Sequence, residues 1–197
     1  GEGSERIVFN ASPIARDGVP GLGAAVAVPS DDRVEVVERD GGWELSNARV
    51  AVFVTANGLI TSAIDRVTGR DAIAPGQAAN LFQLHQDFPN MWDAWDIDKY
   101  YRNSVDDLTA VDSISASVVD GTASVVVTRS FSESTIEQTI TLAPGQRTVA
   151  LRCDIDWHET EKLLKLAFPL DIQATHTEAE TQFGYQSRVT HTNTDRK

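Results

Sequence analysis

The segments Ser134–Leu142, STIEQTITL, and Arg147–Trp157, RTVALRCDIDW, decide the fold class of this chain. In both segments apolar and polar residues alternate, which is typical of β-strands with one buried face. The apolar face of the second segment consists of Val149, Leu151, Cys153, Ile155 and Trp157. We therefore predict two strands here, with Trp157 in the core.

Turn chemistry predicts how the strands are joined. Asp120-Gly121 and Asn57-Gly58 each separate two alternating runs, and both pairs suit the positive φ angles of a two-residue hairpin. Pro144-Gly145 suits a type II turn, and Thr68-Gly69 marks a fourth turn. Asp98–Ser104 has room for one or two helical turns. We predict strands over residues 48–54, 59–65, 80–86, 122–131, 134–142 and 147–157.

Strands at this spacing, joined by hairpins, predict an all-β protein built as an antiparallel β-sandwich. The first thirty residues differ, because Asn10–Pro29 contains three prolines and three glycines. We interpret residues 1–30 as an extended leader with one or two edge strands, and residues 31–197 as the sandwich domain.

Composition argues against several classes of partner. Of the 197 residues 41% are hydrophobic, and 17 basic residues stand against 29 acidic ones, for a net charge of -12. This charge repels phosphate backbones and anionic membranes, so we expect neither nucleic acid nor a membrane as a partner. No apolar run approaches the ~20 residues of a membrane helix. The single cysteine, Cys153, suits a small core side chain and a reducing, cytoplasmic compartment.

The segment Leu81–Tyr101, LFQLHQDFPNMWDAWDIDKYY, holds the densest set of candidate site residues. It begins as a strand, breaks at a proline, and then places Trp92, Asp93, Trp95 and Asp96 within five residues. Indole rings pack on the apolar faces of sugars, and carboxylates accept hydrogen bonds from neighbouring hydroxyls. A structural alternative stays open, in which the tryptophans anchor a loop to the sandwich and the aspartates cap a short helix.

A second segment, residues 179–194, is rich in hydrogen-bonding side chains. It suits a hydroxylated ligand at a strand end, and equally an ordinary solvent-facing loop. The four histidines of the chain are too scattered for local zinc-ligand spacing. No phosphate-binding loop or nucleophile elbow is present. The histidine spacing predicts no metal site in this chain. Asp93, Asp96 and Asp98 leave open an acidic pair for glycoside chemistry, whose separation the sequence does not give. The polar side chains of the segment are Gln182, Tyr185, Arg188, His191 and Asn193.

Three stretches resemble the C-terminal region of family 38 α-mannosidases, in the branch of bacterial, fungal-vacuolar and cytosolic enzymes. They are FQLHQDFPNMWDAWDID at 82–98, DWHETEKLLKLAFPLDI at 156–172 and TQFGYQSRVTHTNT at 181–194. The leader VFNASPIARDGVP at 8–20 is similar to the segment that joins the family's catalytic part to its sandwich. The resemblance implies a large sandwich of the galactose-mutarotase-like (supersandwich) kind.

The resemblance also implies a parent enzyme that hydrolyses terminal α-mannosides with retention of configuration, with zinc gripping the sugar hydroxyls. The zinc ligands and the nucleophilic aspartate would lie in an N-terminal catalytic domain, which would be the partner of this sandwich. The resemblance therefore implies that this chain holds no catalytic residue. The sandwich would lend substrate-binding side chains to the pocket rim. The best-matched positions for that role are Trp92, Asp93, Trp95, Asp96, Arg188 and His191.

The sequence departs from the family pattern near its end. Val189 stands where the family usually has proline, and Asn193-Thr194 is followed by Asp195-Arg196-Lys197 in place of the usual continuation. The family's remaining strands are missing, so we expect a truncated sandwich with an exposed edge that invites pairing into a homo-oligomer. Three functions stay open: an accessory domain of an α-mannosidase, inactive alone; a stand-alone carbohydrate-binding sandwich; and a structural interface domain.

Overall fold

The computed structural model describes residues 7–15, 18–26, 32–92 and 95–191. These residues form strands paired antiparallel throughout, together with one short 3-10 helix, η1 (Lys99–Asn103). The all-β antiparallel class predicted from the sequence is therefore confirmed. The helical turns predicted for Asp98–Ser104 are confirmed as well, with Asp98 as the N-cap and Ser104 as the C-cap.

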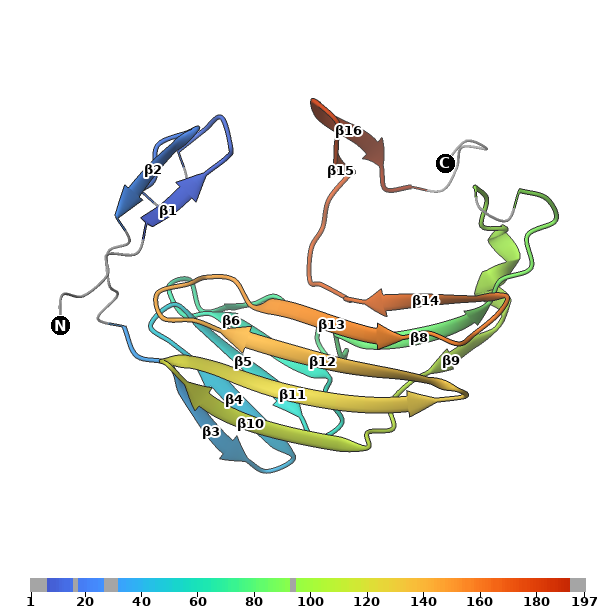
Figure 1. Cartoon of the computed structure of the whole chain (residues 1–197), viewed down its shortest axis with the longest axis horizontal. Coiled ribbons are helices and arrows are strands. Elements are labelled where there is room, and N and C mark those ends of the chain that lie inside the picture. The colour runs from blue at the N-terminus through green and yellow to red at the C-terminus, as the bar shows by residue number, and fades with distance from the viewer. Residues whose placement is uncertain (1–6, 16–17, 27–31, 93–94, 192–197) are drawn as a thin grey trace.

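Two sheets form the layers of the sandwich (Figure 1). One has the order β10-β11-β12-β13, and the other has the order β3-β4-β5-β6-β7. The strands of the first sheet are β10 (Ser113–Val119), β11 (Thr122–Phe131), β12 (Ser134–Leu142) and β13 (Ala150–Asp156). Those of the second are β3 (Glu35–Arg39), β4 (Gly42–Ser46), β5 (Val50–Thr55), β6 (Ile60–Asp65) and β7 (Arg70–Asp71).

A third sheet extends the second layer. The loop that contains Trp92 and Trp95 follows its strand β8. Its order is β14-β8-β9, with β8 (Leu81–Gln86), β9 (Val105–Asp107) and β14 (Lys162–Ala167). Isolated bridges from Ile60 to Ala79 and from Ile73 to Leu170 connect it to the five-stranded sheet.

Two hairpins stand apart from these layers, as Figure 1 shows. They are β1 (Ile7–Asn10) with β2 (Gly23–Val26), and β15 (His176–Thr181) with β16 (Gly184–Val189). Among the described residues, the two leader strands pair with each other and with no strand of the main sheets, so they are not edge strands of those sheets. Every residue of β15 and β16 is exposed. Most of residues 179–194, for which the sequence allowed a solvent-facing loop, therefore forms a solvent-exposed hairpin.

The core lies between the two layers. Val125, Val127 and Ile140 of the first sheet are fully buried against Leu45 and Val54 of the second. Alternation along β11 and β12 produces this arrangement, since their inward positions are buried and their outward positions are half-buried or exposed.

Buried polar side chains tie the layers together. The amides of Asn80 and Gln138 exchange two hydrogen bonds of 2.8 Å each. The guanidinium of Arg129 donates to the carbonyls of Ala110 and Asn57, at 3.0 and 2.7 Å. Because an unpaired buried polar group costs about 1–3 kcal/mol, such pairs fix how the layers face each other.

The turn predictions were right at three positions and wrong at one. The turn at Thr68-Gly69 is present, with Gly69 at φ 71° and its N–H donating to the Asp65 carbonyl. Asp120 and Gly121 both have positive φ, 49° and 74°, and Gly145 has φ 70° with Gln146 N–H donating to the Ala143 carbonyl. At Asn57-Gly58 only the glycine has positive φ, and the loop spans 56–59. The Thr55 hydroxyl accepts from Leu59 N–H and closes this longer loop.

The prediction that Trp157 lies in the core was wrong, because 38% of its surface is exposed. It follows β13, which runs over Ala150–Asp156 and not over 147–157. Its ring contacts Phe131, with centroids 6.1 Å apart. The alternation is correct in phase, but Ile155 on the same face is also 44% exposed, so the opposite layer does not cover this end of the strand.

Candidate functional site

The end of the three-stranded sheet sets up the candidate site. β14 runs antiparallel to β8 with Lys162 opposite Gln86. The ladder continues for one more step, since the Asp87 N–H donates to the Glu161 carbonyl at 2.8 Å. Two carboxylate residues, Asp87 and Glu161, are therefore adjacent where the chain leaves the sheet.

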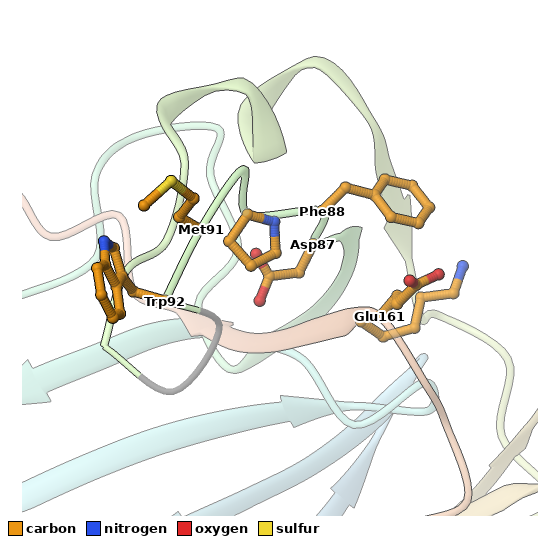
Figure 2. A pocket seen from close by; sticks show the side chains of 7 residues that line it. Asp87, Phe88, Met91, Trp92 and Glu161 are labelled. Atoms are coloured by element: carbon orange, nitrogen blue, oxygen red, sulfur yellow. The ribbon is translucent and has the colours of Figure 1, made fainter.

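An open hollow of about 550 Å³ lies at this point. Figure 2 shows Met91 and Trp92 on one side, Glu161 on the other and Asp87 between them. The hollow combines an indole, a thioether, a phenyl ring and two carboxylates, a mixture suited to a ligand with both apolar faces and hydroxyl groups. Its lining consists of Asp87, Phe88, Pro89, Met91, Trp92, Glu161 and Lys162.

Asp87 has an unused acceptor. Its Oδ1 atom is buried and has no hydrogen-bond partner among the residues that the structure describes. A buried carboxylate oxygen without a donor is costly, so a fold retains it only with compensation from elsewhere. Oδ1 is closed off from solvent in this conformation, so a turn of the half-buried Asp87 side chain toward the hollow is needed before a hydroxyl group there can supply the missing donor.

Backbone strain accompanies these residues. Trp92 has φ 64° and Glu161 has φ 53°, in the left-handed region that non-glycine residues disfavour by about 1–2 kcal/mol each. The Trp92 carbonyl accepts from the N–H groups of both Trp95 and Asp96, at 2.7 and 2.9 Å, which closes a tight turn. Strain of this kind concentrates at ligand sites, where it holds side chains in working positions.

The loop carries an exposed apolar surface. Trp92 is 68% exposed and Trp95 is 91% exposed, and Phe88 and Met91 are exposed beside them. The structural alternative, in which the tryptophans anchor the loop and the nearby aspartates cap a helix, is therefore wrong for the described residues. Asp98 provides the cap instead, because its side chain accepts from the Tyr100 N–H.

A separate group of side chains, His85, Tyr101 and Lys165, holds the end of the loop that leads into η1. His85 is buried, contacts the Ser104 carbonyl through Nδ1 at 2.9 Å, and packs edge-on against Tyr101. Lys165 of β14 donates to the Tyr101 hydroxyl at 2.9 Å, and this hydrogen bond lowers the pKa of Tyr101 below its usual value. The far end of the loop is thus fastened to β8 and β14 without using the tryptophans.

Comparison with known proteins gives the family. Residues 45–197 match the C-terminal domain of the glycosyl hydrolases of family 38. The chain belongs to this family. It is 30% identical to alpha-mannosidase 2C1 of Mus musculus over 188 residues, and 31% identical to alpha-mannosidase 2C1 of Homo sapiens over 170 residues. The alpha-mannosidase of Saccharomyces cerevisiae is 28% identical over 165 residues.

The family 38 chain is much shorter than these relatives. The matches cover 89%, 85% and 76% of this chain, but only 18%, 16% and 15% of the three relatives. The chain therefore spans less than a fifth of their length. The match begins at Leu45, inside β4, and runs through the hollow and both strands of the β15–β16 hairpin.

Only some of the predicted site residues of this family 38 domain line the hollow among the residues that the structure describes. Trp92 lines the hollow, whereas Trp95 and Asp96 lie exposed in the same loop without lining it. Arg188 and His191 do not line it either: Arg188 is exposed on β16, where it donates to Gln186, and His191 is exposed beyond it. Asp93 lies outside the described residues.

Sequence reasoning missed Asp87 and Glu161. Both fall within the stretches that resemble the family, but neither stands in a recognisable motif. The signal that bears on Asp87 is its position directly before Phe88-Pro89, where the strand pattern breaks. Glu161 gives no such signal, because only the pairing of β14 with β8 brings it beside Asp87.

The described residues form neither a metal-ligand cluster nor a membrane-spanning helix. Among the described residues, no group of three or more His, Cys, Asp or Glu side chains could hold a metal ion. The same part of the chain contains no helix long and apolar enough to cross a membrane.

Proposed function

We propose that this domain is an accessory part of a retaining, zinc-dependent α-mannosidase, and that its hollow binds hydroxyl groups of a terminal α-mannoside at the rim of the active site. The nucleophile would come from another domain of the parent enzyme. The observation that carries this proposal is the buried, unpartnered Oδ1 of Asp87, in a hollow walled by an exposed indole.

Four of the lining residues have a defined task in this proposal. The Asp87 carboxylate accepts a hydrogen bond from a sugar hydroxyl, and Glu161 accepts from a neighbouring one. The Trp92 indole packs on the apolar C–H face of the pyranose. Lys162 places a positive charge at the edge of the two carboxylates. These contacts bind and orient the sugar, and none of them breaks the glycosidic bond.

Zinc belongs elsewhere in this proposal. The described residues offer no set of metal ligands, so they do not fit the zinc that the family resemblance implies. Retaining hydrolysis requires two carboxyl groups that flank the bond, and the proposal assigns the nucleophile to the catalytic domain.

The two detached hairpins support a second role as an interface for that catalytic domain. Phe9 of β1 is 78% exposed, and Phe183 in the β15–β16 turn is fully exposed. An isolated two-stranded hairpin is marginally stable in water, so these hairpins need a partner to hold them.

The lone cysteine fits a cytoplasmic location for the assembled enzyme, which we include in the proposal.

The proposal is tested in an intact enzyme that carries this domain. Asp87→Asn should lower kcat/KM for an aryl α-mannoside by roughly 10- to 150-fold, the scale of one lost charge-assisted hydrogen bond. Tm should stay unchanged, since the variant keeps the backbone bond to Glu161. Asp40→Asn, an exposed carboxylate in the β3–β4 turn, is the matched control and should leave kcat/KM unchanged.

The isolated 197-residue chain provides the complementary test. It should not hydrolyse aryl α-mannosides, with or without added zinc. Turnover well above a buffer blank would contradict the proposal that the nucleophile comes from another domain. An unchanged kcat/KM for Asp87→Asn in the intact enzyme would contradict the role of the hollow.

A further inference from the structure

We infer that the free edge of β13 is a self-association surface, through which two copies of this chain pair antiparallel about a twofold axis at Cys153. This inference goes beyond the proposed function and does not depend on it. β13 has one neighbour in its sheet, β12, so in the described part of the chain its other edge presents backbone groups that no strand pairs. Such an edge is a template for another strand.

Of the usual devices that prevent pairing, the β13 edge has charged side chains but lacks proline, lysine and a bulge. Ala150–Asp156 contains no proline and no lysine, and its register with β12 runs without a bulge. The opposite edge of the same sheet differs, because β10 lies against β3 of the other layer. The sheet is therefore most open to a new strand along β13.

The charges of β13 are self-complementary about its central residue. With Cys153 opposite Cys153, Arg152 of each copy stands opposite Asp154 of the other, and the pair occurs twice. Leu151 then stands opposite Ile155 on the inner face. Within one chain Arg152 already reaches Asp154 with two hydrogen bonds of 2.9 and 3.1 Å, which places both side chains on the outer face.

This charge pattern selects one register. If the axis passed through Arg152, two guanidinium groups would face each other. If it passed through Asp154, two carboxylates would face each other, although Arg152 would then stand opposite Asp156 on both sides. Asp154 also stands opposite Glu137 of β12, a like-charge pair that a second guanidinium would offset. Only the arrangement about Cys153 places Arg152 against Asp154 on both sides.

The apolar face supports the same pairing. Leu151 and Cys153 are half-buried, and Ile155 is 44% exposed. A second β13 would cover these side chains. The net charge of -12 opposes association at long range, but salt screens charges that lie more than about 8 Å apart at physiological ionic strength.

A charge-reversal experiment on the full 197-residue chain tests the inference by sedimentation equilibrium. Arg152→Asp places two carboxylate pairs in its homodimer, and Asp154→Arg places two guanidinium pairs in its own. Each variant should dimerise roughly tenfold more weakly than the unmodified chain. An equimolar mixture should regain dimerisation, because every facing pair is then of opposite charge.

Controls separate this edge from general charge effects and from misfolding. Arg39→Asp makes the same change of charge on β3 and should leave dimerisation unchanged. Circular dichroism and Tm verify that each variant folds. If a reversal fails to fold, Arg152→Gln and Asp154→Asn remove the attraction without repulsion and should each still weaken the dimer.

Cys153 provides an independent readout. Residues directly opposite in an antiparallel pair have Cα atoms about 4.5–5.5 Å apart, within the range that a disulfide spans. Mild oxidation of the unmodified chain should therefore yield a covalent dimer that Cys153→Ser abolishes. A chain that stays monomeric at about 1 mM, a mixture that does not regain dimerisation, or oxidation that gives no covalent dimer would each overturn the inference.

Discussion

The strands β12 and β13 are hydrogen-bonded neighbours with the same alternating pattern, yet they differ in burial. Ile136, Ile140 and Leu142 of β12 are fully buried, whereas Ile155 of β13 is 44% exposed. Ile136 and Ile155 are direct register partners, so the contrast occurs within one cross-strand pair. Alternation therefore specifies which face is apolar, and the second layer decides whether that face is covered.

The largest loss of stability is expected from a substitution at the Ile136–Ile155 pair. Ile136→Ala should destabilise the chain by about 2–5 kcal/mol, because it opens a cavity in a fully packed site. Ile155→Ala makes the same chemical change across the ladder and should cost clearly less, about 1 kcal/mol. Urea unfolding monitored by circular dichroism measures both. Equal losses would show that β13 is as well covered as β12.

A second test concerns polar groups in the covered region. Gln138→Leu removes both hydrogen bonds to Asn80 and leaves the buried Asn80 carbonyl oxygen without its donor. We expect a loss of about 1–3 kcal/mol, the cost of stranding a buried polar group. Gln186→Leu on the exposed hairpin is the matched control and should change the stability by less than about 0.5 kcal/mol.

The smallest effect on stability is expected from the exposed ion pair between Arg147 and Asp65, and it depends on pH. Arg147, in the loop between β12 and β13, hydrogen-bonds Asp65 of β6 and, with the backbone N–H groups of Thr68 and Val67, lowers the pKa of Asp65 from 3.8 to about 2. Because the folded-state pKa is depressed, this contribution to stability is present above pH 4 and is lost as the pH falls toward 2.

Arg147→Gln tests that margin. The variant should lose less stability than the unmodified chain between pH 4 and pH 2, and the difference should shrink in high salt because the pair is exposed. Unfolding by urea at several pH values measures it. Parallel curves for the two proteins would mean that the ion pair does not couple the two layers in solution.

The periodic segments were the most predictable part of the fold. β11 and β12 have the ends we predicted, because strong alternation and turn pairs such as Asp120-Gly121 act locally. The apolar face of β13 was also predicted, but the exposure of Trp157 was not. Its burial depends on what lies opposite in the other layer, and no local pattern encodes that.

The candidate site was less predictable than the fold. Composition drew attention to the Trp92 loop, and Trp92 does line the hollow. Glu161 lies far from Asp87 in the sequence and joins it only through the β8–β14 pairing. The family resemblance favoured Arg188 and His191, which the described structure leaves exposed outside the hollow.

The most direct test of the account combines Asp87→Asn with monodeoxy substrates in an intact enzyme that carries this domain. If Asp87 accepts a hydrogen bond from one sugar hydroxyl, the loss of kcat/KM in the variant should disappear on the α-mannoside that lacks that hydroxyl, and persist on the other deoxy analogues. An equal loss on the parent sugar and on every analogue would contradict the claim that the hollow binds a substrate hydroxyl.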